Sequence, residues 1–596
     1  MVKTGVAFPD YISTEKIRRK NRNFEGKTYS MRGFFLIFCL FVAILAIFIK
    51  LFYLQIIQGS YYRYLADNNR TRTLVVHAPR GVIFDRNGTP LVYNIPGFRK
   101  KVGNKTVLLS KDEAISLIAK GEKDLEVDSL RQYPFKEAMA HVLGYIGQIS
   151  KSELEDPQFA DYKGGDLVGK MGIERQYEDR LRGIDEKQLV EVDSMGNTIR
   201  KLGQTDPIPG ENIKLTVDKD LQLAAYNGMK DVKRGAVVVS SPDGGIMALY
   251  SKPSFDPNLF TLGKSYKVAS DSAYQNLSDV LLNGKDQPLL NRAISGQYPP
   301  GSTFKIVVAS GGLEDKIIDE NWEVDDTGVL KVGAFSFANW YYTGYGRTEG
   351  MVNVVKALKR SNDIFFYKLG DKMGVDELAK WSQKFGIGKP LGIDLPGEAS
   401  GLVPTAAWKQ KTIGEPWYLG DNFHYGIGQG YLLATPLQVN SWTQAISNQG
   451  VLYQPHLLLD QKPRVEQSKF LSQKTFDLVR QGMVEACSTG GVAWPFFDFK
   501  VKNKNLPIDG KNILEVPQAT TSADFKDYRK VVIACKTGTA EQGGDSALPH
   551  AWITLFAPAY NPKIVVTVLV EESGEGSNVA APIAKKIVES YFSNLK

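Results

Sequence analysis

The chain of 596 residues is long enough for several domains, and its 43% apolar and 23% charged residues are ordinary proportions for a folded protein. The net charge of +8 is uneven: residues 1–32 hold eight basic and three acidic residues, net +5, which leaves only +3 for the rest and gives no argument for nucleic-acid binding. One of the three cysteines, Cys39, lies in an apolar run, so at most one disulfide remains and a disulfide-rich scaffold is excluded.

The first predicted element is a membrane anchor. Residues 33–49 carry no charge, and at about 1.5 Å per residue they span roughly 25 Å, which the stretch through Leu54 extends to the ~30 Å of a bilayer core. A cleaved signal peptide or a buried soluble helix is the alternative, but no small-residue cleavage site follows the run. We therefore expect a cytoplasmic tail at 1–32, a single transmembrane segment at 33–54, and the remainder outside the cytoplasm, because basic flanks stay inside.

The next elements, over residues 55–211, are short. Residues 77–88 alternate before an Asn-Gly turn and predict a β-hairpin. We expect helices at 112–119 and 174–181 and a strand at 141–147.

A glycine-rich stretch at 164–171 is one residue from a phosphate-binding loop. The motif needs Ser or Thr after the lysine to hold magnesium, and Met171 stands there instead. A plain loop before a helix is the better interpretation.

The composition changes near Pro209-Gly210, and residues 212–596 predict one α+β domain. The expected elements are a strand at 213–217, a helix capped by Asp218, a hairpin at 235–250, helices between about 303 and 490, strands at 530–534, 551–556 and 563–570, and a helix at 582–592. Strands at both ends with helices between them suggest a sheet closed by the two ends of the domain. The polar residues 498–529 look like a surface insertion.

The strongest chemical signal is Tyr298-Pro299-Pro300-Gly301-Ser302-Thr303-Phe304-Lys305, followed by an apolar run that predicts a buried helix from Ser302. Ser302 and Lys305 are three apart and share one helical face. Serine is a weak nucleophile until a neighbouring base takes its proton, and burial or a second cation can lower a lysine pKa enough for that task. An ordinary Ser and Lys in a helix is the alternative, since the pattern is common.

Two further motifs follow, the second about 60 residues after the first and the third about 170 residues after the second. Ser361-Asn362-Asp363 lies between two predicted helices, and Cys535-Lys536-Thr537-Gly538-Thr539 ends an apolar strand. A strand edge of this kind can take an extended peptide as an added strand. This order matches the S-x-x-K, S-x-N and K-T-G set of the penicillin-recognising serine enzymes.

With these motifs the chain resembles a class B penicillin-binding protein, a monofunctional peptidoglycan D,D-transpeptidase. Similar to family signatures are also residues 80–88 (RGVIFDRNG), 141–147 (HVLGYIG), 426–436 (GIGQGYLLATP) and 550–558 (HAWITLFAP). The resemblance covers nearly everything from the anchor to Glu572. It implies a dimerisation-like pedestal domain at 55–211, elongated in this family, and a transpeptidase domain of the serine β-lactamase-like fold, an antiparallel sheet with helices, at 212–596.

The resemblance also implies roles for individual residues. Ser302 would be the acylated nucleophile, Lys305 its base, and Ser361 the proton relay to the leaving amine. Lys536 and Thr537 would bind the terminal carboxylate of the substrate. The backbone N–H groups of Ser302 and Thr539 would form the oxyanion hole, with Gly538 allowing close approach.

The middle motif departs from the commonest form, because its third residue is Asp363 rather than Asn. An ionised Asp only accepts hydrogen bonds, so Asp363 could receive them from substrate N–H groups or pair with a lysine. Similar S-x-D forms are typical of elongation-type members, which favours that subgroup over division-type. The stretch between Val92 and His141 is also shorter than is usual in the family.

The partners implied are peptidoglycan stem peptides, β-lactam antibiotics and a membrane glycosyltransferase of the elongation machinery. The sequence suggests no cofactor or metal: it has no H-E-x-x-H, no paired-cysteine spacing, and its histidines form no triad. Two other functions stay open, a β-lactam sensor or hydrolase on the same fold and a non-catalytic scaffold for the glycosyltransferase. A hydrolase is disfavoured because no E-x-x-L-N run follows the second motif.

Overall fold

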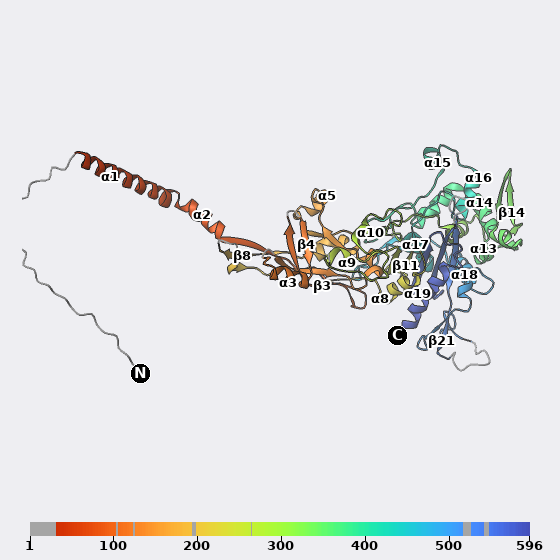
Figure 1. Ribbon diagram of the computed structural model, residues 1–596. Coiled ribbons are helices and arrows are strands. Elements are labelled where there is room, and N and C mark those ends of the chain that lie inside the picture. Colours follow the sequence, from red (N-terminus) through yellow and green to blue (C-terminus); the bar gives the residue numbers. More distant parts are fainter. Residues whose placement is uncertain are drawn as a thin grey trace, which may run out of the picture. The chain divides into compact units, whose positions relative to one another are not determined.

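The computed structural model of the protein (Figure 1) describes residues 31–102, 105–122, 125–193, 198–263, 265–516, 526–541 and 548–595. The chain divides into two compact units, Met1–Leu74 with Leu189–Gly203 and Val75–Gln188 with Gln204–Lys596. The tail predicted at 1–32 lies outside the described residues except for its last two positions. The domain limit predicted between residues 211 and 212 falls inside the second unit and stays a prediction.

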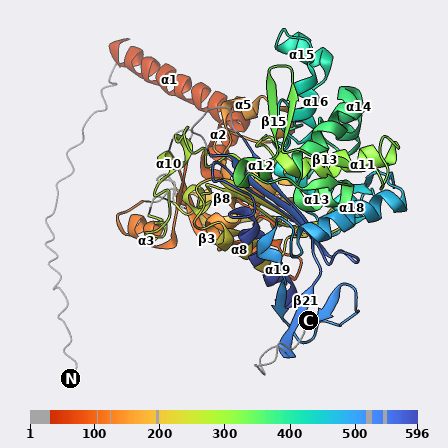
Figure 2. The same ribbon diagram turned by 90° about the vertical axis from the view of Figure 1, so that its right-hand side faces the viewer.

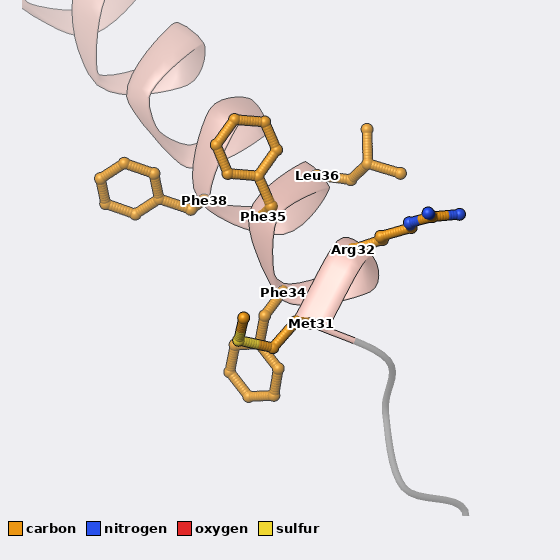
Figure 3. A pocket seen from close by; sticks show the side chains of 6 residues that line it. All are labelled: Met31, Arg32, Phe34, Phe35, Leu36 and Phe38. Atoms are coloured by element: carbon orange, nitrogen blue, oxygen red, sulfur yellow. The ribbon is translucent and has the colours of Figure 1, made fainter.

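The first unit holds the predicted anchor. Helix α1 (Met31–Phe52) leads into a π-helical turn, η1 (Tyr53–Ile57), and then into α2 (Gly59–Arg70). Residues Met31–Ile57 are long and apolar enough to cross a membrane, with a mean hydropathy of 3.0 in their most apolar window. Figure 3 shows the start of α1, where Phe34, Phe35 and Phe38 project outward from the single helix, as side chains facing lipid do.

The remainder of the first unit is most of a three-stranded sheet in the order β1 (Thr71–Val76), β8 (Glu186–Val192), β9 (Thr198–Gln204). The carboxylate of Glu191 pairs with Arg70 and Arg200 in this unit.

The second unit begins with the predicted hairpin, which is confirmed. Strand β2 (Ile83–Phe84) pairs antiparallel with β3 (Pro90–Val102) across a turn in which Gly88 has φ +86°. The Asp85 carboxylate fixes the turn by accepting hydrogen bonds from the N–H groups of Asn87 and Thr89 at 2.9 and 2.7 Å. Strands β4 (Lys105–Leu109), β5 (Leu125–Gln132) and β10 (Ile213–Lys214) complete this sheet.

One predicted strand in this region is wrong. Residues 141–143 belong to helix α4 (Ala140–Leu143), and the strand, β6 (Ile146–Gln148), begins only after Gly144 at φ +76° ends the helix. His141 is held in that helix by a hydrogen bond between its Nε2 and Pro288 O at 2.9 Å. The stretch predicted as a loop at 164–171 contributes β7 (Leu167–Gly169), which pairs with β6.

The predicted helices of this region are present. They are α3 (Lys111–Ala119), α6 (Gly172–Gln176) and α7 (Glu178–Leu181), accompanied by the short α5 (Lys151–Leu154). Ser110 begins α3 with a capping box in which its hydroxyl accepts from Glu113 N.

A five-stranded antiparallel sheet organises the rest of the second unit. Its order is β12 (Ile246–Lys252), β11 (Gly235–Ser240), β24 (Ile564–Val570), β23 (His550–Ala557), β22 (Ala534–Ala540). The expectation of a sheet closed by the two ends of the domain is thus confirmed. Strand β22 occupies one edge.

Alternate side chains of this sheet face two layers of helices. Val566 and Val568 belong to one core, with α8 (Lys219–Gly228) and α19 (Ala580–Asn594), which Figure 2 shows side by side. Val565 and Leu569 belong to the opposite core, with α17 (Pro436–Ser447) and α11 (Lys305–Glu314). The predicted cap is confirmed, because Asp218 accepts from Leu221 N.

Helices α13 (Val354–Arg360), α14 (Asp363–Lys384) and α18 (Gln473–Ala486) pack with α11 beside the sheet (Figure 2). Smaller elements surround them: β13 (Val324–Asp326), β14 (Val329–Val332), β15 (Phe335–Ala338), α12 (Trp340–Tyr345), β16 (Gly350–Val352), α15 (Ala406–Thr412), α16 (Leu419–Gly426), β17 (Leu452–Tyr453) and β18 (Val465–Gln467).

The stretch predicted as one strand at 530–534 is divided between two strands of different sheets. Strand β21 (Tyr528–Val531) belongs to a separate small sheet with β19 (Lys500–Lys502) and β20 (Ile513–Glu515), and β22 starts anew at Ala534. Val501 and Ile513 of this sheet are buried in the core beneath α19. Residues 498–529 are therefore partly a packed layer, and residues 517–525 lie outside the described residues.

Candidate active site

Ser302 lies in a short 3₁₀ turn, η4 (Gly301–Phe304), that leads directly into α11. The prediction of a buried helix is confirmed, although its first turn is tighter than an α-helix. Gly301 has φ +54°, and a Cβ there would lie 2.7 Å from the carbonyl oxygen of Thr539. This glycine lets the turn approach strand β22 closely.

Lys305 begins α11 and its side chain is completely buried. Its Nζ donates hydrogen bonds to Ser361 O at 2.8 Å and to Asp363 Oδ1 at 2.6 Å. Burial lowers the pKa of Lys305, and the charge and hydrogen bond of Asp363 oppose that shift by raising it.

Ser361 and Asp363 lie where α13 ends and α14 begins. Ser361 has the left-handed φ of +53°, which is strained for a residue other than glycine. Such strain persists where the surroundings over-determine it, often at functional sites. Here the left-handed turn directs the Ser361 hydroxyl between two lysines: its Oγ lies 3.4 Å from Lys305 Nζ and 2.8 Å from Lys536 Nζ.

Lys536 lies within β22 rather than at its end, and its side chain is fully buried. Its Nζ also donates to Thr537 O at 2.9 Å. Burial lowers the pKa of Lys536 strongly, the charge of Lys305 lowers it further, and Asp363 opposes both effects.

Gly538 and Thr539 continue the same edge strand. A Cβ on Gly538 would lie 3.0 Å from Thr303 Cγ2 and 3.1 Å from Pro300 O, so this position runs against the turn that carries Ser302. Thr539 is exposed. The backbone of β22 and the backbone of Ser302 therefore border one common space, and the described strands leave the outer edge of β22 free to accept a peptide.

The electrostatics of the site oppose a positive charge on both lysines at once. Two buried amines share one carboxylate, Asp363, so a state with both amines charged leaves excess positive charge in a dry site. A hydroxyl between two amines can accept a hydrogen bond from one and donate a hydrogen bond to the other only when that second amine is neutral. The site thus favours one neutral lysine, a property of the coupled pair.

The three motifs meet as expected, with one difference. Among the described residues the Ser302 hydroxyl has no hydrogen-bonded base, since Lys305 donates to Ser361 O and Asp363 instead. Catalytic hydrogen bonds in ligand-free structures often tighten only when substrate binds.

Sequence reasoning left open whether the chain forms a disulfide, and the structure contains one between Cys487 and Cys535 with a Cα–Cα distance of 5.8 Å. Cys487 caps the end of α18, and Cys535 directly precedes Lys536. Because α18 packs against α13, the disulfide ties the strand of the third motif to the helix pair that leads to the second.

Replacing both Cys487 and Cys535 by alanine is expected to lower the free energy of unfolding by about 4 kcal/mol, since the bond closes a loop with a sequence separation of 48 residues. Thermal unfolding of the detergent-solubilised protein measures the effect. Cys39→Ala, in the exposed anchor helix, is the matched control and should leave the unfolding midpoint unchanged. Equal midpoints for the double variant and the control would show that the bond contributes nothing.

Comparison with known proteins shows which families and solved structures the chain is similar to. The family model described as "Penicillin binding protein transpeptidase domain" matches residues 235–589, and that described as "Penicillin-binding Protein dimerisation domain" matches residues 123–215. The chain is 31% identical over 611 residues to the "Peptidoglycan D,D-transpeptidase MrdA" of Haemophilus influenzae, covering 92% of this chain and 89% of the relative.

Two solved structures resemble it throughout. The "Complex between Penicillin-Binding Protein (PBP2) and MreC from Helicobacter pylori" aligns with a TM-score of 0.70 and 28% identity over 88% of this chain and 99% of the other. A structure described as "Structural coordination of polymerization and crosslinking by a peptidoglycan synthase complex" aligns with a TM-score of 0.69 and 26% identity over 95% of this chain and 99% of the other.

Proposed function

The chain belongs to the class B penicillin-binding proteins, and from that premise we propose that it is an elongation-type peptidoglycan D,D-transpeptidase with Ser302 as its nucleophile. The observation that carries the proposal is the meeting of three distant segments. The Ser361 hydroxyl lies 3.4 Å from Lys305 Nζ and 2.8 Å from Lys536 Nζ, and Lys305 follows Ser302 by one helical turn.

In the first half-reaction Ser302 Oγ attacks the carbonyl carbon of the penultimate D-Ala of a donor stem peptide. Its proton passes to the neutral amine of Lys305, and the carbonyl oxygen becomes an oxyanion that accepts hydrogen bonds from the N–H groups of Ser302 and Thr539. The C–N bond then breaks, the terminal D-Ala leaves as an amine, and the proton reaches its nitrogen through Ser361.

In the second half-reaction an amine of a neighbouring stem peptide attacks the acyl carbon, and its proton passes to the neutral amine of the lysine pair. The ester bond to Ser302 then breaks, and that proton passes from the lysine to Ser302 Oγ. A β-lactam enters by the same first step and remains attached, because its ring-opened amine is not released.

Strand β22 would hold the donor peptide. Its outer edge offers main-chain groups for strand addition, and Lys536 and Thr537 supply a cation and a hydroxyl for the terminal carboxylate. This role requires Lys536 charged when substrate is bound, so the incoming carboxylate would favour the protonated Lys536 and leave Lys305 as the neutral amine.

Asp363→Asn tests the coupling between the second motif and the base. Asp363 raises the pKa of Lys305, so its neutralisation lowers that pKa, and the acid limb of acylation rate against pH moves to lower pH. We also expect the plateau rate to fall roughly 10- to 100-fold, since the carboxylate orients the amine. The rate of acylation by a fluorescent penicillin between pH 5.5 and 9.5 measures both. An acid limb that stays in place would mean that Lys305 is not the titrating base.

The activity itself is tested with un-cross-linked glycan strands that carry D-Ala-D-Ala stems, adding the purified protein and measuring D-Ala release and cross-linked muropeptides by mass spectrometry. We expect both products in equal amounts, and neither with Ser302→Ala. D-Ala released without cross-links would indicate hydrolysis, and cross-links that persist with Ser302→Ala would refute the assignment.

The rate of β-lactam turnover distinguishes a transpeptidase from a β-lactam hydrolase. We expect one nitrocefin opened per protein molecule and then slow release; sustained rapid turnover would favour the hydrolase. The scaffold alternative requires that a Ser302→Ala chain support growth. The name of the Haemophilus influenzae relative and the S-x-D motif favour elongation over division, and localisation of a fluorescent fusion to side wall or septum distinguishes them.

We place the N-terminus in the cytoplasm and the catalytic unit on the outer side of the membrane. The basic residues before α1 support this orientation. The disulfide Cys487–Cys535 supports it independently, because structural disulfides persist in oxidising compartments.

The partners we propose are a membrane glycosyltransferase and a scaffold of the MreC type, by analogy with the two solved structures. We place the scaffold on one face of α3, where Ile115 and Ile118 are three residues apart and are 53% and 52% exposed. Loss of copurification with the scaffold in an Ile115→Asp/Ile118→Asp variant is the expected result; unchanged copurification would exclude this surface.

A further inference from the structure

A buried carboxylate that takes no part in the proposed reaction lies beside the site. Asp326 ends β13 and is 2% exposed. It accepts four hydrogen bonds, from Gly328 N (2.9 Å), Asn339 Nδ2 (2.8 Å), Glu349 N (3.0 Å) and Asn362 Nδ2 (2.8 Å). No lysine or arginine of the described ranges forms an ion pair with it, so these donors alone offset the cost of burying its charge.

Two of the four donors flank Asp363. Asn362 directly precedes it and begins α14, where its Oδ1 accepts from Phe365 N at 2.9 Å. Asn339 Oδ1 accepts from Asp363 N at 3.2 Å. The next residue, Trp340, donates its backbone N–H to Asp363 Oδ2 at 3.0 Å.

These bonds engage the backbone N–H and the Oδ2 of Asp363. Its Oδ1 then accepts the hydrogen bond from Lys305 Nζ. Building on the function proposed above, we propose that Asp326 is a positioning residue for acyl transfer. It holds the amides of Asn339 and Asn362, which fix the backbone on either side of Trp340 and Asp363 and so place the Asp363 carboxylate against Lys305.

A carboxylate suits this position better than an amide. Asp326 Oδ2 alone accepts from Asn339, Asn362 and Glu349 N, while Oδ1 accepts from Gly328 N. An asparagine has only one acceptor oxygen, so its NH₂ would face a donor, and the remaining bonds would lose the assistance of the charge. Asp326→Asn therefore keeps the shape of the side chain but removes the carboxylate that accepts the four hydrogen bonds.

The test measures the rate of acylation by a fluorescent penicillin against pH. The charged groups that face Lys305 are Asp363 and Lys536. We expect Asp326→Asn to lower the plateau rate roughly 10- to 100-fold and to move the acid limb to lower pH, as Asp363→Asn does. Asp325→Asn changes the adjacent exposed carboxylate of the same strand, and it should leave both unchanged.

A double variant tests whether Asp326 affects acylation through Asp363. If Asp326 acts through Asp363, Asp326→Asn/Asp363→Asn acylates no more slowly than Asp363→Asn alone. Should Asp326→Asn fail to fold, Asn339→Ala removes the amide that joins Asp326 Oδ2 to Asp363 N and leaves Asp326 its other three donors. It is expected to give the same shift of the acid limb.

A folded Asp326→Asn protein with the wild-type rate and acid limb would overturn the inference, as would losses that multiply in the double variant. Either result would leave the proposed function standing, whereas a wild-type protein that forms no adduct at Ser302 would refute the function itself.

Discussion

Lys305→Met will lower the rate of penicillin acylation by roughly 10³- to 10⁴-fold at pH 7.5, the contribution of a well-placed general base. The side chain keeps its length and loses the amine that we assign to the Ser302 proton. Stopped-flow acylation with a fluorescent penicillin measures the change.

The buried Asp363 would lose its cation in this variant, which could disturb the site independently of catalysis. Lys305→Met/Asp363→Asn removes that orphaned charge and is the control: it should recover thermal stability but not the rate. Lys372→Met, an exposed lysine on α14, should acylate normally. Recovery of the acylation rate in the double variant would contradict the role of Lys305 as base.

Lys536→Met will lower kcat/KM for a D-Ala-D-Ala donor roughly 30- to 1000-fold, because the desolvated carboxylate of the donor loses its cation. This factor corresponds to a loss of about 2–4 kcal/mol of transition-state stabilisation. The sharper measurement compares two donors. Wild type should prefer the free carboxylate over a C-terminal carboxamide by a similar factor, and Lys536→Met should treat both donors alike.

Lys530→Met, on the neighbouring small sheet, is the control and should keep the wild-type preference. If Lys536→Met still favours the carboxylate by the wild-type factor, then Lys536 does not bind it, and its part in the site is confined to its hydrogen bonds with Ser361 and Thr537 O.

Much of the fold can be predicted from the sequence, because many of its elements are specified by residues close together in the chain. The hairpin turn at Asn87-Gly88, the cap at Asp218 and the turn at Asp243-Gly244 between β11 and β12 each depend on a few adjacent residues, and each is present. The three motifs were found in the same way, by residue type and order.

The wrong elements depended on tertiary contacts. Residues 141–147 are apolar enough for a strand, yet His141 is held in a helix by the carbonyl of Pro288, far along the chain. The apolar run before Cys535 is divided between two sheets, a break that no breaker residue marks.

Long-range partnerships were beyond the sequence for the same reason. Nothing near Asp326 indicates that its carboxylate accepts from Asn339 and Asn362, and nothing near Cys535 identifies Cys487 as its partner. The S-x-D motif predicts that Asp363 can pair with a lysine, but the choice of Lys305 follows only from the packing of α11 against α14.

Mass spectrometry of the covalent adduct tests the central claim most directly. The protein is incubated with a labelled penicillin, digested, and the modified peptide sequenced. The account predicts one adduct per chain, on Ser302, absent from Ser302→Ala and slowed in Lys305→Met. An adduct on another residue, or one that survives in Ser302→Ala, would contradict it.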